Sequence, residues 1–138
     1  MVPDINIWAV LVATVASMVV GMVWYTPKTF GSAWMRLARV EPGQGKSIAG
    51  PLIVSAIAAF ITAWVLAGSA FIAQEFYGGS FLANTLITGV ILWAGFTLAR
   101  FFTHDAFEGR PAALTLLNAA HELVAVLAMG LVIGLFGV

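Results

Sequence analysis

The chain has 138 residues, of which 62% are hydrophobic and only 9% are charged, and its formal net charge is zero. Soluble domains carry roughly 25% charged residues, so this chain has too few charges to cover the surface of a water-soluble globule. A chain without net positive charge is not expected to bind nucleic acid, and a chain without cysteine can form no disulfide, thiolate nucleophile or Cys-ligated metal site.

Four apolar segments follow one another along the chain, over residues 5–24, 48–73, 81–102 and 111–138. Each has the roughly 20 residues that a helix needs to cross about 30 Å of hydrocarbon. Lipid admits only helices and closed barrels, and long apolar runs without strict alternation favour helices. Asp4, Ser47 and Ser80 are candidate N-caps of the first three helices. The sequence therefore predicts one all-α domain over residues 1–138, an integral membrane bundle of four transmembrane helices.

The basic residues predict the orientation of this bundle. No Lys or Arg precedes the first segment, which is also longer than the apolar part of a secretory signal, so we expect it to be retained. Arg100 and Arg110 flank the third connection, and the N-terminus and residues 74–80 carry no Lys or Arg. By the positive-inside rule, the first and third connections are cytoplasmic and both termini extracytoplasmic, in a bacterial cytoplasmic membrane. The remaining basic residues all lie in the first connection: Lys28, Arg36, Arg39 and Lys46.

The first connection also contains a short amphipathic segment over residues 30–39. Phe30, Trp34 and Leu37 recur there at helical spacing, with Arg36 and Arg39 beside them. Such a segment suits the headgroup zone of a bilayer. Trp24, Tyr25 and Trp34 would add an aromatic belt at the same depth. We interpret residues 30–39 as an interfacial anchor helix, with a gating or partner-docking function as the alternative.

Three stretches carry a resemblance to a known family: "VWYTPKTFGSAWMRL" after the first segment, "FEGRP" before the fourth, and "LNAAHELVAVLAMGLVIGL" within it. Together they resemble the small bacterial four-helix membrane proteins catalogued as domain of unknown function 1761. The resemblance covers nearly the whole chain and implies the four-helix architecture. It brings no established activity, so it assigns no catalytic residue.

The fourth segment carries polar residues where lipid tails are expected. At about 100° per residue, Thr115, Asn118, His121 and Glu122 share an arc of about 120°, opposite a face of leucines. Glu122 lies about 16 Å along a helix that starts at residue 111, which is near the bilayer midplane. The same depth on the other helices brings in Thr14, Ser17, Thr62 and Trp93. The sequence thus predicts a polar layer at the midplane.

A carboxylate at this depth costs a few kcal/mol or more unless it is neutralised. Glu122 can bind a proton or pair with a cation, but His121 lies about 100° away around the helix, so a direct pair looks awkward. Two interpretations stay open. The polar groups bond across helices and fix the packing, or Glu122 is a proton or ion site that His121 assists.

A second cluster of titratable residues lies on the predicted cytoplasmic side, around the third connection. His104 and Glu108 are four residues apart and could share a metal on a helix, but two or three such ligands in a wet loop are a weak signal. We interpret the cluster as solvated charges and expect neither a metal nor a cofactor. Its members are Arg100, His104, Asp105, Glu108 and Arg110.

Small residues predict where helices approach one another closely. Ala13, Ser17 and Gly21 step by four along the first helix, and Gly130 and Gly134 do so along the fourth. The two glycines fall on the leucine side of the fourth helix. We call the gap left by Gly130 and Gly134 the glycine notch. A glycine notch that faces lipid predicts a homo-oligomer or a larger membrane complex.

The leading functional hypothesis is an oligomeric transporter or permeation protein with a protonatable midplane site. The alternative is a non-catalytic accessory or structural subunit of a larger membrane complex. The chain contains no nucleophile elbow, phosphate loop or zinc motif, so we do not expect an enzyme.

Overall fold

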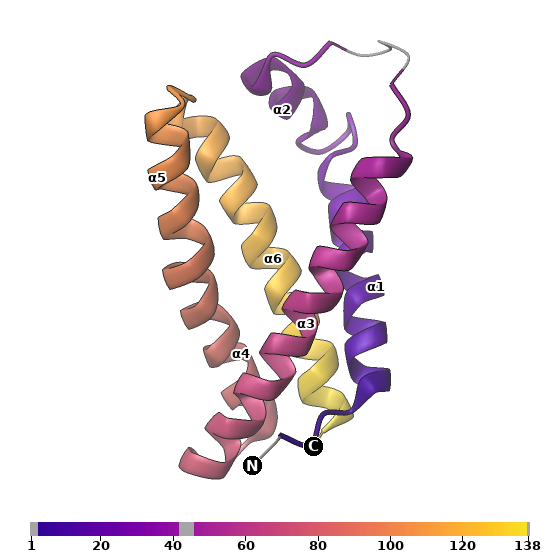
Figure 1. Cartoon of the computed structure of the whole chain (residues 1–138), viewed down its shortest axis with the longest axis vertical. Helices are drawn as coiled ribbons and strands as arrows, with labels where there is room; N and C mark the ends of the chain where they lie inside the picture. Colours follow the sequence, from indigo (N-terminus) through magenta and orange to yellow (C-terminus); the bar gives the residue numbers. More distant parts are fainter. Residues whose placement is uncertain (1–2, 42–45, 138) are drawn as a thin grey trace.

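Four long helices form the body of the protein, as the computed structural model shows for residues 3–41 and 46–137 (Figure 1). All four are long and apolar enough to cross a membrane, and the described residues contain no strand. The third span, Phe81–Phe107, is continuous but contains a π-helical segment, η1. The elements are α1 (Ile7–Trp24), α2 (Gly31–Ala38), α3 (Ala49–Tyr77), α4 (Phe81–Leu92), η1 (Trp93–Leu98), α5 (Ala99–Phe107) and α6 (Ala112–Phe136).

The predicted segments match these helices, with the largest differences at two C-terminal ends. The second and third spans continue to Tyr77 and Phe107, four and five residues beyond the apolar runs. Polar residues such as Gln74 and Glu75 are good helix formers, so an apolar run ends earlier than the helix that contains it. Gly78, with φ of 64°, follows the last residue of α3, because a glycine adopts this left-handed conformation without strain.

Side-chain caps begin α1 and α4. Ser80 Oγ accepts a hydrogen bond from Ala83 N at 3.3 Å, as predicted for the third span. In α1 the cap is Asn6 rather than Asp4, because Asn6 Oδ1 accepts from the backbone N–H groups of Trp8 and Ala9 at 3.1 and 3.3 Å. The N-cap of α1 therefore lies two residues later than the predicted cap, Asp4.

The tightly packed core lies toward the end of the bundle where the described parts of both termini lie (Figure 1). Ala13 of α1, Ala63 and Leu66 of α3, and Met129 and Ile133 of α6 are each at most 2% exposed. Alanine at the crossing points lets α1 approach α3 and α6 closely, which favours helix association in lipid. Toward the other end the spans diverge, and α2 lies over that end of the bundle (Figure 1).

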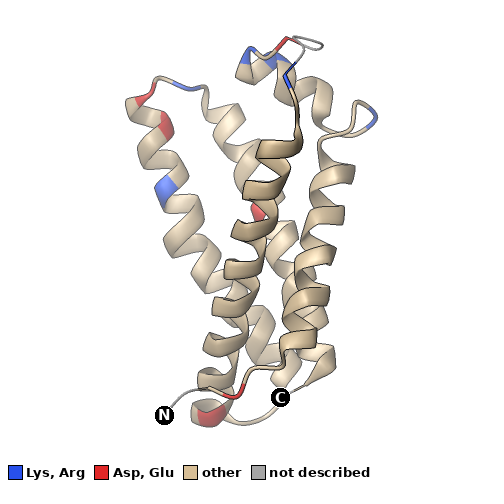
Figure 2. Cartoon of the chain, turned by 45° about the vertical axis from the view of Figure 1, so that its right-hand side comes forward, with Lys and Arg blue, Asp and Glu red and all other residues tan. Residues whose placement is uncertain are grey.

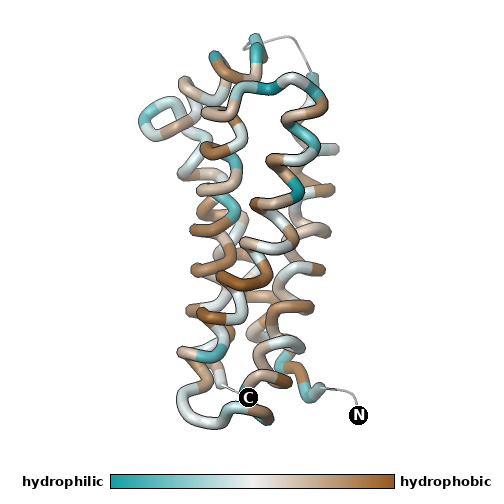
Figure 3. Tube along the Cα trace, turned by 90° about the vertical axis from the view of Figure 1, so that its left-hand side faces the viewer, coloured by the Kyte–Doolittle hydropathy of each residue, from teal (hydrophilic) through white to brown (hydrophobic). Residues whose placement is uncertain are grey.

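The outer surface of the spans is apolar along most of their length. Val15, Ile53 and Ile91 are each at least 60% exposed, although they lie on three different spans. Figure 3 shows hydrophilic residues gathered mainly toward the ends of the molecule. Burial in lipid is the physical explanation for so much exposed apolar surface on helices of this length.

Charged residues are unevenly distributed between the two ends (Figure 2). Lys and Arg appear only toward the end that carries α2 and the α5–α6 turn, whereas Asp and Glu occur at both ends. The described parts of the two connections that were predicted to lie on one side therefore do lie at one end of the molecule, and the described parts of both termini lie at the other (Figure 1).

The glycine notch on α6 is filled from within the bundle, which corrects the prediction that it faces lipid. A Cβ built on Gly134 would lie 2.8 Å from Leu82 Cα, and one on Gly130 would lie 3.2 Å from Leu86 Cδ2. Helix α4 thus packs into the notch, because the leucine side of α6 is wide enough to meet both a neighbouring helix and lipid. The notch is therefore no argument for a second copy of the chain.

Candidate functional site

A cavity of about 400 Å³ lies between α1, α3 and α6, beyond the tightly packed core. Glu122 and His121 of α6 line it together with Ser17 and Gly21 of α1 and Thr62 of α3. These residues include the ionisable pair that the sequence placed near the midplane. Glu122 follows the first residue of α6 by ten positions, which corresponds to about 15 Å along the helix axis.

Glu122 and His121 form a direct pair, contrary to the expectation from the helical wheel. Nδ1 of His121 lies 3.3 Å from Oε1 of Glu122. The wheel places Cβ atoms only, and a glutamate arm is long enough to swing its carboxylate around the helix to the neighbouring ring. Both side chains line the cavity, and Glu122, at 40% exposed, is the more open member of the pair, since the His121 side chain is 14% exposed.

Gly21 provides the space that the imidazole ring occupies. A Cβ built on Gly21 would lie 3.3 Å from Nε2 of His121, so α1 passes close to the ring. The small residues that step by four along α1 therefore have different functions. Ala13 lies in the core, Ser17 lines the cavity, and Gly21 accommodates His121.

An aromatic cap, consisting of Trp24, Tyr25, Phe30 and Trp34, covers His121 from the α2 side. The ring centroids of Tyr25 and Trp24 lie 4.9 and 6.0 Å from that of His121. The Trp34 ring packs edge-on against Tyr25, with 5.7 Å between the ring centroids, and the ring centroids of Phe30 and Trp24 lie 4.3 Å apart. Tyr25, one of the belt residues predicted for the interface, therefore also lines the cavity.

A hydrogen bond fixes the aromatic cap to α6. The hydroxyl of Tyr25 donates to Oδ1 of Asn118 at 2.9 Å. Burial, assisted by the Glu122 carboxylate, raises the pKa of Tyr25 to about 12. The phenol therefore stays protonated at physiological pH and keeps donating to Asn118.

Beneath the cap, two buried nitrogens have no hydrogen-bond partner among the described residues: Nε2 of His121 and Nε1 of Trp24. If neutral His121 donates from Nδ1 to Glu122, its Nε2 is an acceptor, whereas the indole Nε1–H of Trp24 can only donate. These two atoms are thus complementary in hydrogen bonding. Among the described residues, the His121 ring therefore has, beyond its contact with Glu122, an unpaired nitrogen that faces a second unpaired group in the cap.

The predicted polar layer is only partly brought together. Ser17, Thr62, His121 and Glu122 meet at the cavity. Thr14 instead donates to the carbonyl of Val10, one turn back on its own helix, at 2.8 Å. Thr115 donates to Asp105 Oδ2 at 2.8 Å, and Trp93 Nε1 donates to the carbonyl of Ala119, also at 2.8 Å. The layer thus divides into one site and several bonds between or within helices.

A second cavity, of about 390 Å³, lies on the other flank of α3, against α4, η1 and α6. Its walls are mostly apolar and include Leu66, Trp93 and Phe96. Thr62 and Val126 line both cavities. The π-helical turn begins at Trp93, and such turns are frequent at functional sites, but the sequence gives no signal that predicts it.

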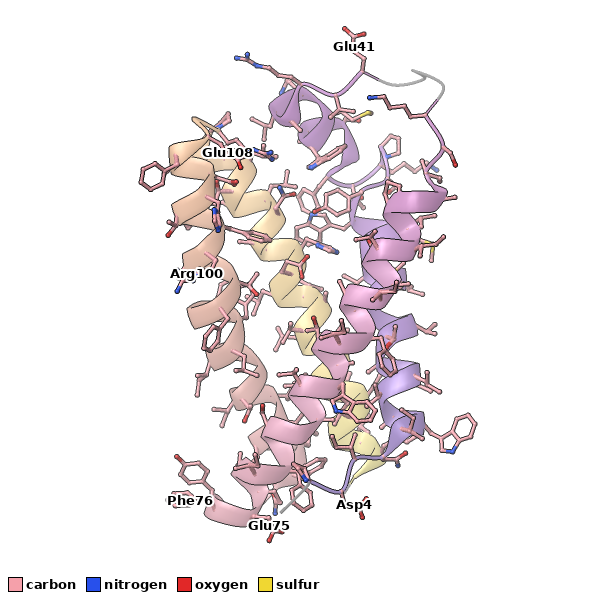
Figure 4. All side chains as sticks on the ribbon, viewed as in Figure 1. Asp4, Glu41, Glu75, Phe76, Arg100 and Glu108 are labelled. Atoms are coloured by element: carbon pink, nitrogen blue, oxygen red, sulfur yellow. The ribbon has the colours of Figure 1, made fainter. Side chains whose placement is uncertain are left out.

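The cluster at the third connection fixes the turn between α5 and α6. Arg110 Nε lies 2.7 Å from Glu108 Oε2 and 3.9 Å from Asp105 Oδ1. His104 is exposed, and Figure 4 shows Arg100 on the outer side of its helix. Arg100 is therefore not placed to neutralise Glu122.

The interfacial segment forms α2, over Gly31–Ala38 rather than residues 30–39. Its Trp34 is half-buried and contacts Tyr25, whereas Arg36 and Arg39 are exposed. The arginines thus point away from the bundle while the aromatic residue packs onto it, which is the arrangement of an amphipathic helix at an interface.

Sequence reasoning placed Tyr25 in the belt and missed that it belongs to the site. A signal for it exists, because Tyr25 continues the four-residue step of Ala13, Ser17 and Gly21 on one face of α1. Met18, Met22 and Met129 also line the cavity and were not singled out. Methionine is common in any apolar helix, so its type alone gave no indication of a site.

The fold and the site define a class: an all-α bundle of four membrane-spanning helices with a carboxylate–histidine pair inside it. The chain belongs to the family described as "Protein of unknown function (DUF1761)", whose model matches residues 8–134. The resemblance noted from the sequence is thereby confirmed. No curated protein and no solved structure matches the chain.

Proposed function

We propose that this protein transports cations across the membrane in exchange for protons, with Glu122 as the shared binding site. The observation that carries the proposal is the Glu122 carboxylate, which opens into a cavity within the spans while it contacts His121. A carboxylate among apolar helices is neutralised by a proton or by a cation. Competition between these two for one carboxylate is the elementary step of coupled exchange.

The surroundings of Glu122 support this function in preference to a purely structural one. A carboxylate that only fixed helix packing would be enclosed by donors from neighbouring helices, as Asp105 is by Thr115 and Arg110. Among the described residues, the ion-pair partner of Glu122 is His121 of its own helix, and the Glu122 side chain is 40% exposed. This leaves lone pairs free for a proton or a ligand.

We further propose that the end carrying α2 is cytoplasmic and that both termini are extracytoplasmic, in a bacterial cytoplasmic membrane. The support is the gathering of Lys and Arg toward that end, which the positive-inside rule relates to the cytoplasm. In this orientation the aromatic cap lies on the cytoplasmic side of His121. The proposed function is transport without chemical turnover, so we propose no enzymatic activity.

An accessory subunit of a larger membrane complex is the second candidate, and the first turns of α3 favour it. Residues 49–55 are all exposed, including Leu52, Ile53 and Val54, so this segment lacks close packing on any side. Another chain could cover it as readily as lipid. The accessory subunit is supported if mildly solubilised membranes yield the protein in one larger complex of constant stoichiometry. The proton–cation exchanger is supported if they yield it as a single chain or a homo-oligomer. The oligomeric state stays a prediction.

Proton–cation exchange can be tested in liposomes that enclose a pH-sensitive dye. Purified protein is reconstituted with an outward proton gradient, and K⁺, Na⁺, tetramethylammonium or tetraphenylphosphonium is added outside. We expect at least one of these cations to drive proton release, and Glu122→Gln to abolish it. Glu75→Gln is the matched control, because Glu75 lies at the terminal end of the bundle, away from the cavity (Figure 4). Exchange by Glu122→Gln at the wild-type rate, or no exchange with any cation, contradicts the proposal.

A further inference from the structure

We propose that the transported cation is amphipathic and organic, with its charged centre against Glu122 and its apolar body extending beneath α3 into the second cavity. This inference rests on the proposed function and names its substrate class. It follows from the side-chain oxygens that line the first cavity, from the apolar walls of both cavities, and from the side on which each cavity opens.

The first cavity offers a small inorganic cation one carboxylate, and its other side-chain oxygens are neutral hydroxyls. Hard cations take several oxygen ligands to replace their hydration shell. Among the described residues, Glu122 is the only carboxylate that lines the cavity, and the hydroxyls are those of Ser17, Tyr25, Ser55 and Thr62. Two of these hydroxyls already donate, Tyr25 to Asn118 Oδ1 at 2.9 Å and Thr62 to the carbonyl of Ala58 at 2.9 Å. An organic ammonium or phosphonium ion is weakly hydrated and requires one countercharge together with apolar contact.

The remaining walls of the first cavity offer that contact. Met18, Met22 and Met129 line it, and their flexible thioether side chains adapt to ligands of different shape. Tyr25 adds an aromatic ring, and such rings attract organic cations through their electron-rich faces. The site thus combines a single negative charge with adaptable apolar surface.

The second cavity continues this surface on the other side of α3. Thr62 and Val126 form walls of both cavities, so the two cavities are neighbours on either side of these side chains, and the proposed ligand extends past them. The Trp93 N–H is already bonded to the Ala119 carbonyl, so its ring offers the second cavity apolar surface rather than a free donor. Each cavity has a volume within the range of about 300–1,000 Å³ that is usual for sites of drug-sized ligands.

Both cavities open sideways, toward the lipid-facing surface of the bundle. Met22 and Leu52 line the first cavity and are 59% and 44% exposed, although they lie on different helices. Ile61 and Phe96 line the second and are 56% and 73% exposed. An amphipathic cation concentrates in the bilayer, so lateral mouths bring it to Glu122 without passage through the aromatic cap.

Equilibrium binding to the purified full-length protein in detergent tests this inference. Tetraphenylphosphonium is the probe, because its charge does not change with pH, and tetramethylammonium is the comparison, because it has the same charge without an apolar body. We expect tetraphenylphosphonium to bind at least about tenfold more tightly than tetramethylammonium. Its affinity should fall as the pH is lowered and protons compete for Glu122, and this pH dependence should vanish in Glu122→Gln.

A bulky substitution at the second cavity separates the two parts of the site. Val65 lines that cavity and is 50% exposed, so Val65→Trp fills it from the rim. We expect on the order of tenfold weaker tetraphenylphosphonium binding and unchanged tetramethylammonium binding. Val54→Trp is the matched control, because Val54 is 66% exposed on the same helix and lines neither cavity. Should Val65→Trp fail to fold, Phe96→Ala removes an apolar wall of the cavity and should also weaken binding of the larger cation.

The outcomes distinguish the substrate class from the proposed function. Equal affinity for the two cations, or full tetraphenylphosphonium affinity in folded Val65→Trp and in Phe96→Ala, overturns the amphipathic cation. Proton–cation exchange at Glu122 then still stands if a small cation drives it in liposomes. Binding that is independent of Glu122 and of pH overturns both.

Discussion

His121 Nδ1 lies 3.3 Å from Glu122 Oε1, although the two residues are about 100° apart around α6. The pair forms because the glutamate arm reaches around the helix, and because Gly21 leaves room for the ring between α1 and α6. A local contact between sequence neighbours thus depends on a glycine about 100 positions away. The same carboxylate that contacts His121 also lines the cavity.

The hydrogen-bond donor of His121, rather than the ring itself, should hold Glu122 in place. His121→Asn places an amide nitrogen near the position of Nδ1, whereas His121→Ala removes the donor. We expect His121→Ala to lower the free energy of unfolding by about 1–3 kcal/mol, because a partly buried carboxylate loses its partner. His121→Asn should recover part of this loss. Thermal unfolding in detergent measures both, and equal destabilisation by the two variants would show that ring packing dominates.

The Tyr25 hydroxyl should contribute through its bond to Asn118. Tyr25→Phe deletes the donor and keeps the ring, so we expect a loss of about 1 kcal/mol in the free energy of unfolding. Asn118→Ala should cost a similar amount, and the double variant should cost less than the sum of the two. Strict additivity in this double-mutant cycle would refute a direct bond.

The titration of Tyr25 predicts a loss of stability at high pH. Its pKa of about 12 in the folded protein lies above the value of about 10 expected in the unfolded chain, so the folded state holds the phenolic proton more tightly. The resulting stabilisation is complete below pH 10 and is lost as the pH rises from 10 to 12. Ultraviolet titration in a Tyr77→Phe background isolates the Tyr25 signal. Since burial is the main cause and Glu122 the lesser one, Glu122→Gln should lower this pKa only slightly.

Substitution of Gly134 should distinguish packing within the bundle from packing between copies. Gly134→Ala places a Cβ 2.8 Å from Leu82 Cα, and backbone cannot yield as a flexible side chain does. We expect a loss of about 1–3 kcal/mol in protomer stability. Gly95→Ala is the control, because nothing lies within 4 Å of its Cβ position. Dissociation of an oligomer without loss of protomer stability would restore the notch as an interface between copies.

The sequence predicted the four spans because the length of an apolar run indicates whether a helix can cross the hydrocarbon of a bilayer. The structure has the four corresponding helices. The sequence also predicted that Glu122 and His121 share depth with Ser17 and Thr62, since the rise per residue is fixed. The sequence could not predict contacts that residues of one helix make with residues of another. The seating of α4 against Gly134 and the bond from Thr115 to Asp105 require knowledge of which helices are neighbours. The π-helical turn at Trp93 has no local signal in composition or spacing.

The bond from Thr115 to Asp105 should stabilise the turn between α5 and α6. Thr115 is 1% exposed and the Asp105 side chain 16% exposed, so this charge-assisted bond is largely shielded from water. Thr115→Val keeps the shape and deletes the donor, and we expect it to lower the free energy of unfolding by about 1.5–3 kcal/mol. Thr103→Val is a matched control, because the Thr103 hydroxyl is exposed and bonds only to Ala99 on its own helix. Neither variant should alter proton–cation exchange at Glu122, because Thr115 and Thr103 do not line the cavity. Equal effects of the two variants on thermal unfolding would show that the Asp105 bond contributes nothing beyond the loss of a hydroxyl.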